Sequence, residues 1–216
     1  MPIKIDSLTN RRILSISCGD SHTIAVVAGL GSNSAAIIDD DTGMPLTDVV
    51  GWGENSLCQV SGNSKVERYT EPVVISELTG KRIINVGCHR AKTSAVELGG
   101  NVYEWGGVDS NPIRVVYKIE EAQEIIHGNN FTIVRSIDKV YFWGEIRNKA
   151  RNIISERDPT PVSGNIKIDR VSVGYDHVLA TDKEGLVYLI YFSSTVLAQM
   201  NLVNSESIIK SIARED

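Results

Sequence analysis

The sequence predicts an all-β chain built from tandem repeats, and two observations carry that prediction. First, residues 2–19 and 72–89 align without a gap at a constant spacing of 70 residues. Second, short apolar runs alternate with glycine, asparagine and aspartate turns, a pattern that indicates antiparallel hairpins. The matched positions are Pro2/Pro72, Ile5/Ile75, Leu8/Leu78, Thr9/Thr79, Arg12/Arg82, Ile13/Ile83 and Cys18/Cys88. Repetition of this kind predicts a fold in which one small β unit is copied along the chain.

Each copy contains two recognisable strands. The first strand leads into a turn that usually contains glycine, and it recurs at 16–25, 86–95, 125–132 and 171–180. The second strand ends in a Trp-Gly step at Trp52-Gly53, Trp105-Gly106 and Trp143-Gly144, and the fourth copy degrades to 187–192. A proline closes the units at Pro72, Pro112 and Pro161, where the missing N–H suits a loop or a strand edge.

These signals divide residues 1–216 into a single repeat region. We expect units at about 2–71, 72–111, 112–160 and 161–207, with the start of a fifth at 208–216. An insertion at 29–48 enlarges the turn of the first hairpin and accounts for the length of the first unit. Without it, the units have roughly 40–50 residues, which is the length of a propeller blade.

The combined motif resembles the regulator of chromosome condensation (RCC) repeat. That repeat contains Cys-Gly-x-x-His-Thr, then Trp-Gly-x-Asn with a glutamine four residues later, and a final proline. The corresponding residues here are Cys18, Gly19, His22, Thr23, Trp52, Gly53, Asn55, Gln59 and Pro72. The later units depart from it, since His89 and Lys92 replace the glycine and the histidine, and unit four lacks its Trp-Gly.

The chain contains about four repeat units, whereas propellers of this family usually close with about seven blades. The resemblance therefore implies a partial or truncated β-propeller of about four blades of antiparallel strands. An open arc exposes two apolar sheet faces, and monomers rarely leave such faces uncovered. We therefore expect a truncated product of a longer gene, a degenerate short propeller, or an arc completed by another chain. Self-association through the open edges is one form of the last case.

Composition limits the possible partners and compartments. The net charge of −5 argues against direct binding of nucleic acid, which depends on basic side chains. No apolar run is long enough for a membrane span, and the first residues do not form a signal peptide. Three cysteines, at 18, 58 and 88, are typical of free thiols in a reducing compartment, so we expect the cytoplasm and the nucleus.

The sequence offers no catalytic, cofactor-binding or metal-binding residue, and we expect a protein that is not an enzyme. His22 and His177 share one repeat position, which favours a structural role. Cys18 and Cys88 share another, which indicates a small buried apolar position. The tryptophans recur at the strand end and are expected to pack between blades.

Two charged segments are candidates for partner binding, although a solvated loop is the simpler interpretation of both. The first is the acidic tip of the insertion, formed by Asp39, Asp40 and Asp41. A long insertion in a regular array is uncommon unless it is functional or disordered. The second is a local basic patch of Arg147, Lys149 and Arg151, which would suit an acidic protein partner.

Two functions follow from these considerations. The first is a non-catalytic interaction module, because propellers present loops on a rigid rim. Residues 130–144 are similar to a unit of the fungal α-tubulin suppressor subgroup of the family. That resemblance implies binding of a small metalloprotein and an accessory role in Elongator-dependent tRNA wobble uridine modification and in diphthamide synthesis. The alternative is a guanine-nucleotide exchange factor or regulator of a small GTPase.

Overall fold

A computed structural model describes residues 4–29, 43, 46–108, 111–147, 153–162, 167–191 and 199–202. This part of the chain contains sixteen β-strands and two short 3-10 turns, η1 (Asp6–Leu8) and η2 (Ser76–Leu78). Among the described residues, no helix is long and apolar enough to cross a membrane.

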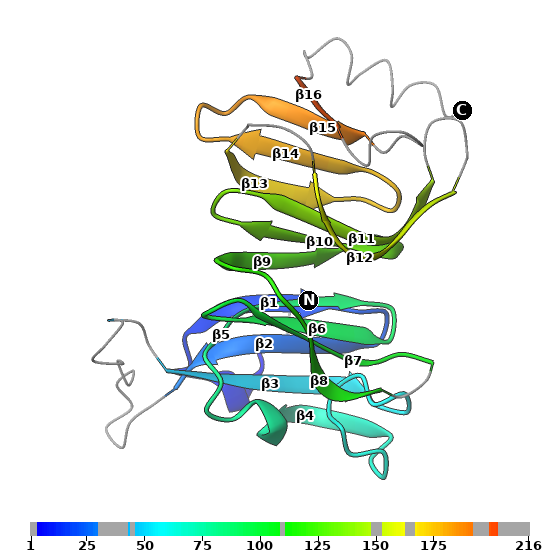
Figure 1. Ribbon diagram of the computed structural model, residues 1–216. Coiled ribbons are helices and arrows are strands. Elements are labelled where there is room, and N and C mark those ends of the chain that lie inside the picture. Colours follow the sequence, from blue (N-terminus) through cyan, green and yellow to red (C-terminus); the bar gives the residue numbers. More distant parts are fainter. Residues whose placement is uncertain are drawn as a thin grey trace. The chain divides into compact units, whose positions relative to one another are not determined.

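The strands form four antiparallel sheets of four strands each, and within each sheet the strands follow chain order (Figure 1). We call these sheets blades 1 to 4. Blade 1 contains β1 (Ile13–Cys18), β2 (His22–Ala28), β3 (Thr47–Glu54) and β4 (Arg68–Val74), and blade 2 contains β5 (Ile83–His89), β6 (Lys92–Glu97), β7 (Asn101–Gly106) and β8 (Asn111–Lys118). Blade 3 contains β9 (Ala122–His127), β10 (Asn130–Ser136), β11 (Val140–Arg147) and β12 (Ile153–Pro161), and blade 4 contains β13 (Ile168–Val173), β14 (Val178–Asp182), β15 (Val187–Tyr191) and β16 (Gln199–Leu202). The prediction of an all-β chain with about four antiparallel blades is confirmed.

The chain divides into two compact units, Met1–Ile125 and Ile126–Asp216. The first contains blades 1 and 2, and the second contains most of blade 3 and all of blade 4. Pro72 and Pro161 lie in β4 and β12, the outermost strands of their sheets, where a missing N–H is tolerated. The proline that marks a unit in the sequence is therefore part of the preceding sheet.

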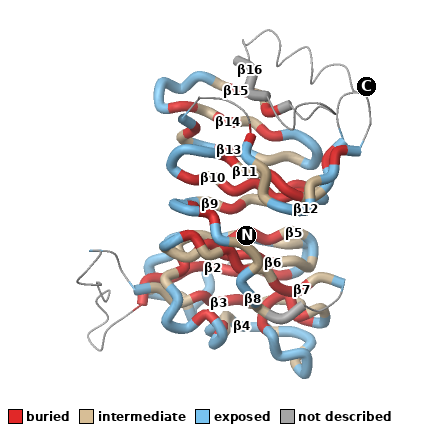
Figure 2. The backbone as a smooth tube through the Cα atoms, viewed as in Figure 1, coloured by how far each residue is buried: buried red, intermediate tan, exposed pale blue. Residues whose placement is uncertain are grey.

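In the first unit, the core lies between the facing surfaces of blades 1 and 2. Successive strand residues point to opposite faces of a sheet, so every second residue reaches this core. Figure 2 shows that the buried positions concentrate in the central strands β2, β3, β6 and β7. Leu78 of η2 enters the same core from the connection between the two blades. The fully buried members include Ile24, Val26, Val60, Ile75, Ile83, Ala95 and Trp105.

In the second unit, blades 3 and 4 pack in the same way. The rings of Phe131 and Phe142 lie 5.9 Å apart at a tilt of 43°, and both belong to the buried core of this unit. On blade 4, Ile190 lies at the strand position of Trp105 in blade 2, and Tyr188 lies at the position of Tyr103. Both residues are buried. The degraded fourth copy therefore retains a packed face although it has lost its tryptophan.

Candidate partner-binding site

The turn after the first strand of a blade depends on contact between a glycine and a ring. In three blades the glycine N–H donates to the carbonyl of the residue three positions later, at 2.9 Å each time. The ring of that later residue lies over the glycine, so that a Cβ there would overlap ring atoms. The pairs are Gly19 with His22, Gly128 with Phe131 and Gly174 with His177.

This contact explains why blade 2 departs from the repeat at two positions together. Lys92 stands where the ring would be, and His89 stands where the glycine would be. Because the lysine places no ring over the turn, the first position has no need to be glycine. The two strands instead continue their ladder to a final pair of His89 and Lys92, and Arg90 in the turn has a φ of 47°.

The first turns also join neighbouring blades. In the first unit, the backbone N–H of Asp20 donates to the carbonyl of Arg90 at 3.1 Å. In the second unit, the N–H of Asn129 donates to the carbonyl of Tyr175 at 3.0 Å. Both donors directly follow the first position of the turn, so the same backbone link recurs between successive repeats.

His22 is a structural residue of the interface between blades 1 and 2. Its side chain is buried, and Nε2 lies 2.8 Å from Thr93 Oγ1. Thr93 Oγ1 donates to the carbonyl of Gln59 at 2.7 Å, so the ring Nε2 carries the proton and donates to the threonine. Burial lowers the pKa of His22 from 6.5 to about 4, against the opposing effects of Asp20 and the Arg90 carbonyl. The histidine is therefore neutral near pH 7, as a scaffold residue should be.

The Trp-Gly-x-Asn…Gln segment of blade 1 is a second part of the scaffold. Asn55 Oδ1 accepts hydrogen bonds from the N–H groups of Val60 and Ser61, both at 2.9 Å, and its Nδ2 donates to two loop carbonyls. The Gln59 carbonyl accepts from Trp105 Nε1 at 3.0 Å, which joins this loop to blade 2. The signature residues thus organise a loop and an interface, and Trp105 packs between blades as the sequence predicts, whereas Trp52 is half-buried against Ala25, Val27 and Val50 of its own blade.

The cysteine prediction is correct for one residue and wrong for the other. Cys88 is buried, and burial raises the pKa of its thiol to about 12. Cys18, at the same repeat position, is exposed, because it lies on the side of blade 1 that faces away from blade 2. Within the described residues, no cluster of three or more histidine, cysteine or acidic side chains could hold a metal ion.

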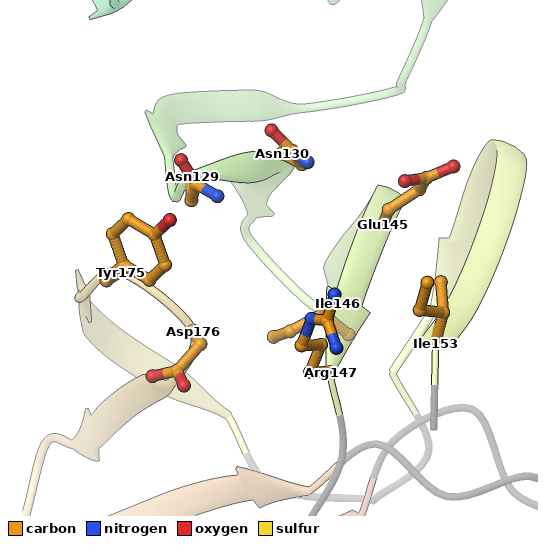
Figure 3. Close-up of a pocket in the computed structure, with 8 residues that line it drawn as sticks. All are labelled: Asn129, Asn130, Glu145, Ile146, Arg147, Ile153, Tyr175 and Asp176. Atoms are coloured by element: carbon orange, nitrogen blue, oxygen red, sulfur yellow. The ribbon is translucent and has the colours of Figure 1, made fainter. Parts of the chain in front are cut away.

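A hollow of about 190 Å³ lies at one edge of blades 3 and 4, within the second unit (Figure 3). Three segments line it: the turn between β9 and β10, the facing ends of β11 and β12, and the turn between β13 and β14. Tyr175 and Ile153 are 69% and 59% exposed. The lining residues are Asn129, Asn130, Glu145, Ile146, Arg147, Ile153, Tyr175 and Asp176.

One of the six predicted partner-binding residues belongs to this hollow. Arg147, at the end of β11, is exposed and lines it, with Glu145 and Asp176 as nearby opposite charges (Figure 3). Lys149 and Arg151 lie outside the described residues, and so do Asp39, Asp40 and Asp41. The insertion joins β2 to β3, whose paired ends are Ala28 and Thr47, at the edge of blade 1 opposite the Gly19 turn.

Tyr175, Asp176, Asn129 and Asn130 were not selected from the sequence. They are the two residues between the glycine and the ring residue of the first turn, in blades 4 and 3. These two positions vary from copy to copy while their neighbours follow the repeat. Variable positions within a fixed turn are the signal that could have identified them.

Comparisons with known proteins agree with this architecture. No protein-family model matches the sequence. The ultraviolet-B receptor UVR8 of Arabidopsis thaliana is 25% identical over 199 residues, which cover 82% of this chain and 41% of UVR8. The human E3 ubiquitin-protein ligase HERC2 is 26% identical over 208 residues, which cover 87% of this chain and 4% of HERC2. The chain carries RCC-like β-propeller repeats.

Solved structures show the same fold. Human WBSCR16 superposes with a TM-score of 0.60 at 15% identity, covering 88% of this chain and 64% of that one. Prp20p of Saccharomyces cerevisiae, described with its binding to Gsp1p and histones, superposes with a TM-score of 0.57 at 14% identity. That match covers 84% of this chain and 57% of Prp20p. The RCC-like chain thus spans less than half of these curated relatives and less than two thirds of these solved chains.

Proposed function

We propose that this RCC-like chain is a non-catalytic interaction module that binds a protein partner at the hollow of blades 3 and 4. The observation that carries the proposal is the exposure of Tyr175 and Ile153 beside Arg147 in one concave surface. Tyrosine and arginine are enriched among the residues that dominate binding energy in protein interfaces. The repeated residues His22 and Trp105, by contrast, are occupied by contacts between blades.

The size of the hollow supports a protein partner. Small-molecule and cofactor sites usually enclose roughly 300–1,000 Å³ and are lined mainly by apolar side chains. The hollow has about 190 Å³, and most of its lining side chains are polar or charged. A volume of this size can accept one or two side chains of a docked protein.

The more specific form of the proposal rests on the resemblance of residues 130–144 to the α-tubulin suppressor subgroup. These residues form the hairpin of β10 and β11, and Asn130 and Arg147 lie at its edge beside the hollow. The partner would then be a small metal-carrying electron-donor protein. The chain would serve as an accessory subunit in Elongator-dependent tRNA wobble uridine modification and in diphthamide synthesis.

Regulation of a small GTPase is the second candidate, and the likeness to Prp20p favours it. Gsp1p, which Prp20p binds, is a small GTPase. Nucleotide exchange needs no general acid or base, because a protein that binds the nucleotide-free GTPase more tightly shifts the population toward it. A protein rim without catalytic residues is sufficient for that activity.

Affinity capture from cell extract tests the site, with the wild-type chain and Tyr175→Ala or Arg147→Glu as baits. We expect both variants to lose at least nine tenths of a captured partner, since hot-spot side chains contribute about 2 kcal/mol or more. Arg114→Glu, an exposed arginine on β8, is the matched control. Equal capture by all baits would refute the hollow as the site, and loss only after deletion of residues 32–45 would assign binding to the insertion.

The identity of the captured protein separates the two functions. A metalloprotein supports the accessory role. A GTPase that releases labelled nucleotide faster in the presence of the purified chain supports regulation. A captured GTPase whose release rate is unchanged would remove the exchange hypothesis.

A further inference from the structure

The charged side chains of the hollow alternate in sign. Arg147 is positive, whereas Glu145 and Asp176 are negative, and all three line the same hollow. In Figure 3, Arg147 lies between Asp176, which comes from the turn between β13 and β14, and Glu145, which belongs to β11. The hollow therefore presents a negative, a positive and a negative group in that order.

These three charges do not neutralise one another. Arg147 and Glu145 are exposed, and neither forms an ion pair with any residue in the described part of the chain, although both belong to β11. Asp176 Oδ1 lies 3.3 Å from Nδ1 of the adjacent His177, and the Asp176 side chain is still 59% exposed. All three groups are therefore accessible to a docked partner.

The spacing of Glu145 and Arg147 suits a partner segment in extended conformation. The ladder between β11 and β12 is regular from Glu145 to Arg147. Alternate residues of a strand point to the same face and lie about 7 Å apart. The burial agrees with this geometry, because Glu145 and Arg147 are exposed and Ile146 between them is buried. An extended segment that lies along β11 presents its own alternate side chains at the same spacing.

A partner segment with only one sign of charge does not suit this arrangement. Arginine binds a carboxylate through two parallel hydrogen bonds, so Arg147 favours an acidic side chain. That acidic side chain would repel Glu145 and Asp176 unless the partner also supplies positive charge beside it. A basic side chain next to Asp176 can also lie over the exposed ring of Tyr175, because aromatic faces attract cations. A segment that carries both signs suits all three groups.

We propose that the hollow binds an extended segment of a partner protein in which an acidic residue lies between two basic residues. The acidic side chain pairs with Arg147, and the basic side chains pair with Glu145 and Asp176. One residue separates the acidic residue from the basic residue that faces Glu145, and the second basic residue lies on the other side of the acidic one. This inference rests on the proposed function, and it specifies the chemistry of the partner at that site.

Four short peptides test the order of the charges by chemical-shift titration of the isotope-labelled chain at low ionic strength. The first is acetyl-Lys-Thr-Glu-Thr-Lys-amide, in which threonine favours the extended conformation. The other three keep the threonines and carry lysine at every charged position, glutamate at every charged position, or the inverted order of glutamate, lysine and glutamate. We expect the first peptide to shift the amide signals of Glu145, Arg147 and Tyr175 with a dissociation constant at least ten-fold below those of the other three.

Every other ranking of the peptides overturns the proposal. Tightest binding of the all-lysine peptide would mean that the net charge of −5 governs attraction and the order of charges does not. Tightest binding of the all-glutamate peptide would mean that Arg147, or Lys149 and Arg151 outside the described residues, selects acidic segments. Equal or tighter binding of the inverted peptide would show that the order is irrelevant. No saturable shift at the hollow with any peptide at millimolar concentration would equally reject the alternating pattern.

Arg147→Glu makes the charged lining wholly acidic and should change the preference. The dissociation constant of the first peptide should rise at least ten-fold, and the all-lysine peptide should become the tightest of the four. Arg170→Glu is the matched control, because Arg170 lies on β13, has a side chain that is 86% exposed and does not line the hollow. It changes the net charge by the same amount and should keep the wild-type ranking, whereas a wild-type ranking in Arg147→Glu would contradict the proposal.

Capture from cell extract separates failure of this inference from failure of the proposed function. Glu145→Lys reverses the negative charge beside Arg147, so it should lose at least nine tenths of the partner that the wild-type chain captures. If Tyr175→Ala loses the partner while Glu145→Lys retains or gains it, the partner docks at the hollow without the alternating charges, and this inference is wrong. Equal capture by the wild type and both variants would instead remove the hollow as the binding site.

Discussion

Acidification should destabilise the first unit through His22. The ring is neutral in the folded protein, since burial holds its pKa at about 4. In the unfolded chain the pKa returns to about 6.5. Between these values the unfolded state binds a proton that the folded state does not bind. The free energy of unfolding therefore falls as the pH falls from 6.5 to 4, and the contribution is complete above pH 6.5.

The size of the effect follows from the two pKa values. Each pKa unit corresponds to about 1.4 kcal/mol, so a fall from 6.5 to about 4 gives about 3 kcal/mol. The repeat itself supplies the best variant, because blade 3 has Phe131 at the position of His22. His22→Phe keeps a ring over Gly19 and loses the hydrogen bond to Thr93, at a cost of about 1 kcal/mol. The variant should thus be slightly less stable than the wild type at pH 7 and about 2 kcal/mol more stable at pH 4.

Urea unfolding at several pH values, followed by tryptophan fluorescence, measures this crossover. Other groups titrate in both proteins, so the difference between the two unfolding free energies isolates His22. His177→Phe is the matched control, because it makes the same substitution at the equivalent repeat position, where the ring is exposed. A constant difference between wild type and His22→Phe from pH 7 to pH 4 would refute the reasoning.

Three further predictions concern the same repeat positions. Thr93→Val should lower the free energy of unfolding by about 2 kcal/mol, because it leaves the buried His22 N–H without an acceptor. In urea unfolding, this effect of Thr93→Val should be smaller when His22→Phe is already present. Gly19→Ala should lower the unfolding free energy by more than about 2 kcal/mol, since its Cβ would meet both a ring and the backbone carbonyl of the next blade. Gly174→Ala should lower the unfolding free energy by less than about 1 kcal/mol, since the three atoms nearest to its Cβ would all belong to the exposed ring of His177, which can move. Equal losses in the two variants would contradict this comparison. Ellman's reagent should titrate one thiol, Cys18, in the dilute native chain and all three in urea, and two fast native thiols would contradict the burial of the others.

Part of the candidate site could be predicted and part could not. Arg147 stands out in the sequence as a positive charge beside a Trp-Gly step in an acidic chain. Tyr175 and Ile153 do not, because apolar residues in a repeat protein are usually core residues. Both side chains line a hollow that forms where the β9–β10 turn, the β13–β14 turn and the facing ends of β11 and β12 lie close together. Residue spacing in the sequence does not indicate that these segments are neighbours.

The sequence by itself determined the fold class and the role of the repeated residues. Alternation of apolar residues sets which side of a strand is buried, and repetition sets which histidines, glycines and tryptophans share one environment. These are local properties, so they can be read along the chain. The structural use of His22 and Trp105 follows from them.

Only the tertiary structure decided how the same residue behaves in different copies. Cys18 and Cys88 share a repeat position, yet one is exposed and the other is buried. His22 and His177 share another, yet burial lowers the pKa of the first while the ring of the second is exposed. The physical reason is that burial depends on whether a neighbouring sheet covers that face, and this property belongs to pairs of blades rather than to the repeat that each blade carries.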